Sequence, residues 1–131
     1  MSGSANAHRE VLAQAEAYGE AVYYARAAAF EEMCHESFQM TLVTPEGLTF
    51  WAKAAYLARV RGREAFAEAA SYGIISIDVA GDETARVHCW VDVPPLRYED
   101  HLGFVKVDGR WMLLTKVFRT KARLDGQEEE R

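Results

Sequence analysis

The spacing of apolar residues predicts two helices in the first third of the chain. From residue 7 onward, Ala15, Tyr18 and Val22 follow one another at intervals of three and four residues, which places them on one face of an α-helix. The pattern slips near Arg26, so we expect a kink or tight turn there. A second short helix then follows over residues 27–35, although neither glycine nor proline marks the boundary.

The middle of the chain predicts a short hairpin followed by a third helix. Apolar and polar residues alternate over residues 37–43, which is the pattern of a strand. The sequence Thr44-Pro-Glu-Gly predicts a turn because proline presets φ at its second position, and we expect residues 48–50 to form a short return strand. Helical spacing follows over residues 51–70, with Gly62 as an end or break.

From Tyr72 the apolar period changes to two, which predicts a meander of four strands. Pro94-Pro95 interrupts it because proline donates no ladder hydrogen bond, and Asp108-Gly109 is a signal for a two-residue type I′ hairpin turn. The expected strands cover residues 73–79, 84–93, 97–107 and 110–120.

Strands gathered after helices predict an α+β domain, with three N-terminal helices packed on the concave face of a curved antiparallel sheet. We expect one domain over residues 7–122, between a disordered start at residues 1–6 and a charged tail at residues 123–131.

The turn at Asp108-Gly109 fixes the register of the last two strands, and register fixes the faces. It predicts Phe104 opposite Leu113, and Asp100 opposite Val117. The predicted concave face carries Asp100, Leu102, Phe104, Trp111, Leu113, Thr115 and Val117. The predicted convex face carries His101, Gly103, Val105, Arg110, Met112, Leu114, Lys116 and Phe118. The second set is also too apolar to be left in water, which favours a subunit interface on that face; a long loop that covers the face is the alternative.

The faces of the hairpin over residues 72–93 stay open. A two-residue loop of Gly81 and Asp82 pairs Ile77 with Arg86, whereas one extra loop residue pairs Ile77 with Val87 or Ala85.

Asp100 and His35 are the candidate catalytic residues. A carboxyl group that points inward among apolar residues has its pKa raised by desolvation and can act as a general acid or base. The alternative for Asp100 is a solvated place at the strand's mouth, or a hydrogen bond to a helix end. His35 stands where the second helix meets the first strand, so it can act as a base, bind a ligand, or only cap the helix.

Apolar and aromatic residues on the inward faces are candidates to line a ligand pocket, although at this spacing they can equally be core. The predicted pocket residues are Tyr18, Val22, Tyr23, Phe30, Met33, Phe38, Met40, Trp51, Leu102, Phe104, Trp111 and Leu113.

Composition and charge remove several classes of function. The chain has 131 residues, half of them hydrophobic, and a net charge of −5, which argues against nucleic acid and an anionic membrane as partners. The N-terminus has no signal-peptide pattern and no segment is long and apolar enough to span a membrane, so we expect a cytoplasmic protein. Cys34 and Cys89 have no CxxC spacing, and the four histidines have no HxH or HExxH spacing. We therefore expect buried thiols, no metal and no cofactor.

Several segments resemble the putative lumazine-binding family of the NTF2-like superfamily, which also contains SnoaL-like cyclases, ketosteroid isomerase and scytalone dehydratase. The resemblance is carried by Ile77-Asp-Val-Ala-Gly-Asp, Thr84-Ala-Arg-Val, Tyr98-Glu-Asp-His-Leu-Gly-Phe-Val-Lys-Val-Asp-Gly-Arg-Trp, Lys116-Val-Phe, and the helix end with His35 before Glu36-Ser37. It implies a cone-shaped α+β barrel with a pocket between helices and sheet, and commonly a homodimer through the sheet. No full catalytic set of the isomerase or dehydratase relatives matches.

Three functions stay open at this point. The first is a module that binds a small hydrophobic or aromatic molecule, which we favour because the apolar lining is better supported than any acid–base pair. The second is an isomerase, cyclase or dehydratase that needs Asp100 and His35 to face one cavity. The third is a homodimeric interaction protein without a ligand.

Overall fold

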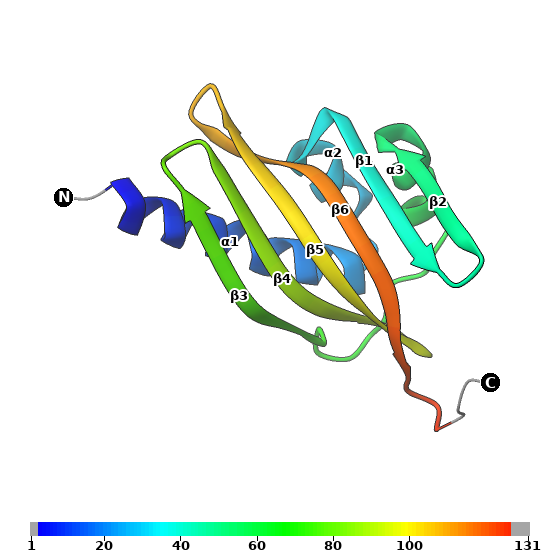
Figure 1. Ribbon diagram of the computed structural model, residues 1–131. Helices are drawn as coiled ribbons and strands as arrows, with labels where there is room; N and C mark the ends of the chain where they lie inside the picture. Colours follow the sequence, from blue (N-terminus) through cyan, green and yellow to red (C-terminus); the bar gives the residue numbers. More distant parts are fainter. Residues whose placement is uncertain (1–2, 127–131) are drawn as a thin grey trace.

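The computed structural model describes residues 3–126, which form three helices and six strands (Figure 1). In chain order these are α1 (Gly3–Tyr23), α2 (Ala27–Met33), β1 (Cys34–Thr44), β2 (Gly47–Ala52), α3 (Lys53–Arg61), β3 (Tyr72–Ala80), β4 (Thr84–Val93), β5 (Leu96–Val107) and β6 (Arg110–Arg123). Helix α1 thus begins inside the start that was predicted to be disordered, and residues 127–131 of the predicted tail lie outside the described residues.

The six strands form one twisted sheet in the order β2-β1-β6-β5-β4-β3. All neighbours are antiparallel except β1 and β6, which run parallel. The helices lie on one face: α1 crosses behind β3 and β4, and α3 lies behind β1 and β2 (Figure 1). We call this helix-covered side the concave face and the other side the outward face. The predicted α+β fold is confirmed.

The turn between α1 and α2 explains why the sequence marks no boundary there. Ala25 adopts a φ of 52°, a left-handed conformation that usually selects glycine or asparagine. The Arg26 amide donates to the Ala21 carbonyl at 2.9 Å, so the turn closes the end of α1 while Arg26 leads into α2. The predicted kink near Arg26 is confirmed.

Helix α3 is shorter than the predicted helix over residues 51–70: the predicted start is wrong, whereas the predicted end or break at Gly62 is confirmed. Trp51 belongs to β2, and α3 ends at Gly62, whose amide bonds the Ala58 carbonyl. The chain that follows packs on the end of α1 instead. There, the Phe66 amide donates to the Tyr23 carbonyl at 3.4 Å, and the two rings lie 5.1 Å apart.

The register of the last hairpin follows the prediction only as far as Phe104 opposite Leu113. A bulge at Leu114 then shifts the ladder, so Gly103 lies opposite Thr115 and Asp100 opposite Phe118. An added Cβ at Gly103 would overlap the Thr115 hydroxyl, which accounts for glycine opposite the bulge.

The bulge corrects the predicted faces of β6. Thr115 and Val117 were predicted on the concave face, but both are exposed on the outward face. Lys116 and Phe118 were predicted on the convex face, but both point inward and are about 5% exposed. Asp100 keeps its predicted inward orientation because the extra residue lies on β6 and not on β5.

The hairpin of β3 and β4 has the longer loop of the two alternatives. Ala80 lies opposite Thr84 and Ile77 opposite Val87, with Gly81 at a φ of 60° in the turn. Val87 is 1% exposed, so this register buries the apolar side of β4.

Both cysteines are buried free thiols, as the sequence predicts. Burial raises the pKa of the Cys34 thiol to about 12 and raises the pKa of Cys89 as well. Neither forms a reactive thiolate at neutral pH.

Candidate functional site

A cavity of about 270 Å³ lies between the concave face of the sheet, α3 and the end of α1. We call it the concave cavity. Its apolar wall consists of Val22, Met40, Val60, Val91, Val93 and Phe118. Its polar and charged groups are Tyr56, Tyr98, Arg59, Arg63 and Lys116. The cavity is therefore mostly apolar, with a few polar groups of which three are cations.

Lys116 brings a buried ammonium group to the cavity, because the β6 bulge turns this lysine inward. Its Nζ donates to the Tyr56 hydroxyl at 3.4 Å and lies over the rings of Tyr18, Tyr56 and Phe118 at 5.3, 5.0 and 4.6 Å. Burial lowers the pKa of Lys116, but Tyr56 and Asp100 raise it by more. The group is therefore positively charged at neutral pH.

Asp100 lies behind the cavity wall, fully buried. The Tyr18 hydroxyl of α1 donates a hydrogen bond to its Oδ2, whereas its Oδ1 has no hydrogen-bond partner among residues 3–126. Burial raises the pKa of Asp100, and the charge of Lys116 opposes that rise. Asp100 is absent from the described residues that line the concave cavity; it is linked to that lining by its charge interaction with Lys116.

Arg63 closes one side of the cavity just beyond α3. Its Nη2 donates to the Val22 carbonyl at 2.6 Å, which fixes the guanidinium group. Its Nη1 is buried and has no hydrogen-bond partner among residues 3–126. One turn earlier, the Arg59 guanidinium lies 5.0 Å from the Trp51 ring centroid.

His35 lies in a different place from Asp100. Its Nδ1 accepts a hydrogen bond from the Ser37 amide at 2.9 Å, and the residue lines a shallow hollow with Lys53 and Met112. Asp100 does not line that hollow; it lies on β5 opposite Phe118, whereas Cys34, next to His35, lies opposite Leu113. The structure therefore does not bring the two predicted catalytic residues together.

The predicted pocket residues divide into three groups. Val22 and Met40 line the concave cavity. Six others are core residues with at most 1% exposure: Tyr18, Phe30, Phe38, Leu102, Phe104 and Leu113. The rest lie around the cavity or in another hollow: Tyr23 against Phe66, Trp51 against Phe118, and Met33 with Trp111 between α1 and the β5–β6 turn.

Sequence reasoning missed the polar residues of the cavity. Tyr56, Arg59, Val60 and Arg63 follow one another at spacings of three, one and three, which places them on one side of the α3 end. That pattern was visible in the sequence and could have found this side of the cavity. Lys116 carried no such signal, because its direction depends on the bulge.

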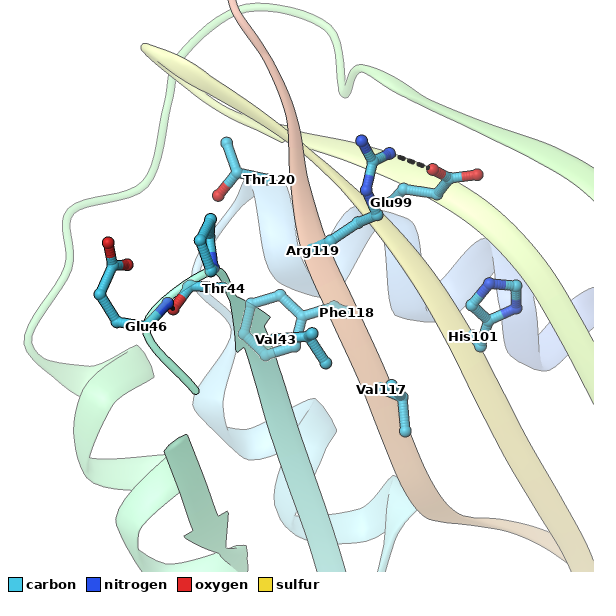
Figure 2. Close-up of a pocket in the computed structure, with 10 residues that line it drawn as sticks. Val43, Thr44, Glu46, Glu99, His101, Val117, Phe118, Arg119 and Thr120 are labelled. Atoms are coloured by element: carbon cyan, nitrogen blue, oxygen red, sulfur yellow. Dashed lines mark hydrogen bonds and ion pairs between the residues drawn. The ribbon is translucent and has the colours of Figure 1, made fainter. Parts of the chain in front are cut away.

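A larger and shallower hollow, of about 850 Å³, lies on the outward face (Figure 2). It sits where the β1–β2 turn diverges from β6, and its lining includes Val43 and Val117, which are 42% and 44% exposed. Figure 2 shows the Arg119 guanidinium paired with the Glu99 carboxylate, at 2.7 Å. Because so much of its lining is exposed, this hollow belongs to an open surface rather than an enclosed ligand site.

Glu99 lines that hollow and is the centre of a charged cluster. Its second oxygen lies 2.5 Å from His88 Nε2, and the His88 ring stacks on the His101 ring at 4.5 Å. Hydrogen bonds from His88 and Arg119 lower the pKa of Glu99. The cluster places a carboxylate and a guanidinium next to the exposed apolar side chains of Val43 and Val117.

Comparison with solved structures shows which class of fold this is. An NTF-2 like protein of unknown function from Silicibacter pomeroyi DSS-3 has a TM-score of 0.82 at 21% identity, over 92% of this chain and 100% of that chain. An NTF2-like protein of unknown function from Shewanella baltica OS155 has a TM-score of 0.75 at 21% identity, over 90% and 94%. A putative scytalone dehydratase from Novosphingobium aromaticivorans DSM 12444 has a TM-score of 0.72 at 17% identity, over 97% and 92%. The chain has the NTF2-like fold.

The sequence places the chain more narrowly within that class. The model of the putative lumazine-binding family matches residues 6–119, and the chain belongs to this family. A search of curated proteins finds no match. No helix within residues 3–126 is long and apolar enough to cross a membrane.

Proposed function

We propose that the chain binds a small aromatic or hydrophobic molecule in the concave cavity. The observation that carries this proposal is an apolar cavity, lined by Phe118 and several valines, into which a few polar groups converge. Ligand sites in proteins have this composition. At about 270 Å³, the cavity suits a molecule with one or two rings. The family's description as putative lumazine-binding agrees, since lumazine is a flat two-ring molecule.

Binding is better supported than turnover. An acid–base enzyme that used Asp100 and His35 would need both groups within hydrogen-bonding reach of one substrate. The two side chains lie in different parts of the fold, and Asp100 does not line the cavity. The proposal therefore keeps the cavity as a binding site and gives Asp100 a structural and electrostatic role.

A cavity-filling substitution tests the binding site. In Val93→Trp, the indole would occupy the cavity from β4, so we expect binding to weaken by at least about tenfold, which corresponds to ~1.4 kcal/mol. The measurement is calorimetric titration with lumazine and a panel of neutral and charged one- and two-ring compounds.

Val79→Trp is the matched control, since Val79 is a partly buried strand valine that does not line the cavity. It should bind like the wild-type protein. Failure of the whole panel to bind the wild-type protein would contradict the proposal and favour an interaction protein without a ligand.

We further propose that two copies of the chain associate through the outward face. Leu48 and Phe50 of β2 are each 57% exposed, beside the half-exposed Val43 and Val117. The ladder places them together, with Val43 opposite Leu48, and Thr41 between Phe50 and Val117. An exposed apolar patch of this kind, rimmed by charged groups, is typical of protein interfaces, and a two-fold contact brings the same patch from both copies together.

The substitution Val117→Arg should abolish this association, because it places a charge in the middle of the patch. Light scattering after size exclusion should give twice the 14.7 kDa chain mass for the wild-type protein and the single mass for the variant. Ile75→Arg changes an equally exposed apolar residue of β3 and should stay dimeric. A wild-type protein of single mass would overturn the interface.

A further inference from the structure

Within residues 3–126, the cations of the concave cavity differ from most other Lys and Arg residues because none of them forms a close ion pair with a carboxylate. Arg59, Arg63 and Lys116 form no ion pair within 4.0 Å in the part of the chain that the structure describes. By contrast, the nearby Arg61 pairs with Glu31 at 3.2 Å. No acidic residue is among the described residues that line the cavity, so its electrostatic character is positive even though the chain is acidic overall.

Arg63 is the most informative of the three. Its Nη2 is held by the Val22 carbonyl, so the position of the guanidinium plane is fixed before any ligand arrives. Its Nη1 is buried without a partner, and burial lowers the pKa of the group. A buried donor on a charged group is costly to leave unpaired, whereas an anion in the cavity would complete its hydrogen bonding.

Lys116 provides a second positive group on the opposite wall, from β6. Its hydrogen bond goes to the neutral Tyr56 hydroxyl, and the carboxylate that acts on it, Asp100, lies behind the wall rather than in the cavity. The ammonium group can therefore attract a negative ligand group across the cavity.

From this arrangement we infer that the ligand is an aromatic carboxylic acid, bound as its carboxylate by Arg63 and Lys116 while its ring lies against Phe118 and the valines. This inference rests on the proposed function of the same cavity. We choose a carboxylate among the possible anionic groups because its two oxygens lie in one plane and match the donor geometry of the Arg63 guanidinium. It is also small enough to leave most of the 270 Å³ to a ring.

Matched pairs of an aromatic acid and its amide test the inference, because the two members of each pair have nearly the same shape but differ in charge. The probes are 2-naphthoate with 2-naphthamide, benzoate with benzamide, and indole-3-acetate with indole-3-acetamide. At 50 mM salt, we expect at least one acid to bind the wild-type protein at least about tenfold more tightly than its amide. In Arg63→Gln that preference should disappear through loss of acid binding, with amide binding unchanged.

Arg61→Gln is the control, because Arg61 is exposed, two residues away and outside the cavity lining; it should keep the preference for acids. Arg63→Lys retains the charge but loses the planar pair of donors, so it should recover only part of the preference. This second variant keeps the test valid if Arg63→Gln does not fold.

The possible outcomes separate the two proposals. Amides that bind as tightly as acids would overturn the anion inference and leave the binding site intact. A preference for acids that survives Arg63→Gln would overturn the role of Arg63. If neither member of any pair binds, and the panel with lumazine also fails, the binding function itself is contradicted.

Discussion

Replacing Asp100 with alanine should lower the free energy of unfolding by about 3–5 kcal/mol, the range for removing one member of a buried, interacting pair. Asp100 is fully buried, accepts the hydrogen bond of the Tyr18 hydroxyl, and supports the charge of Lys116. Alanine would leave the hydroxyl without an acceptor and the ammonium without its nearby carboxylate. Both losses occur where water cannot replace the missing group.

Urea unfolding at neutral pH measures this effect. Asp78→Ala is the contrast, since its carboxylate is 65% exposed and pairs with Arg86 on the surface, and such pairs contribute under about 1 kcal/mol. Asp100→Asn, which keeps the acceptor for Tyr18, should be less harmful than Asp100→Ala. Equal small losses for Asp100→Ala and Asp78→Ala would show that the buried network contributes nothing to stability.

The inward direction of Asp100 could be predicted because it depends only on alternation along β5. Asp100, Leu102 and Phe104 share one face whatever β6 does, and all three are buried. The turn at Asp108-Gly109 also gave the correct pairs next to the loop. Local turn chemistry and the two-residue period are properties of short segments, which is why sequence reasoning succeeded with them.

The direction of Lys116 could not be predicted because one extra residue at Leu114 reverses the faces of residues 115–120. Over Thr115-Lys116-Val117-Phe118, each face of the strand carries one polar and one apolar residue in either register, so the pattern does not reveal the bulge. The inward lysine that gives the cavity its charge was therefore assigned to the outward face.

The lining of the cavity was mispredicted for a different reason. Apolar periodicity finds the residues that are buried, and large aromatic residues such as Phe30 and Phe38 fill the core completely. A cavity lies where the packing is incomplete, at the edge of that core, and its groups here include Arg59 and Arg63. From the sequence, charged residues at the end of a helix are expected to face solvent. They line a cavity here only because α3 packs over the sheet.

Replacing Lys116 with methionine should make stability depend strongly on pH. Burial already raises the pKa of Asp100, and the charge of Lys116 opposes the rise, so the variant should raise it further. An acid whose pKa is higher in the folded state stabilises that state below its unfolded pKa of about 3.9, and this contribution is lost as pH rises through the folded pKa. The variant should therefore lose up to about 1.4 kcal/mol per pH unit across a wider window than the wild-type protein.

Urea unfolding from pH 4 to pH 8 measures the free energy of unfolding of the variant and of the wild-type protein. Plotted against pH, the two curves should diverge. Near pH 4 the variant should be at least as stable as the wild-type protein, because a buried lysine beside a neutral Asp100 is itself costly. Toward pH 8 the variant should be clearly less stable, because Asp100 then ionises without a counter-charge.

Lys106→Met is the control. It removes a lysine that pairs with Glu10 near the surface, at 3.5 Å, and its curve should stay parallel to that of the wild-type protein. If the Lys116→Met curve is also parallel, Asp100 does not titrate against Lys116, and the electrostatic link between the core and the concave cavity is absent.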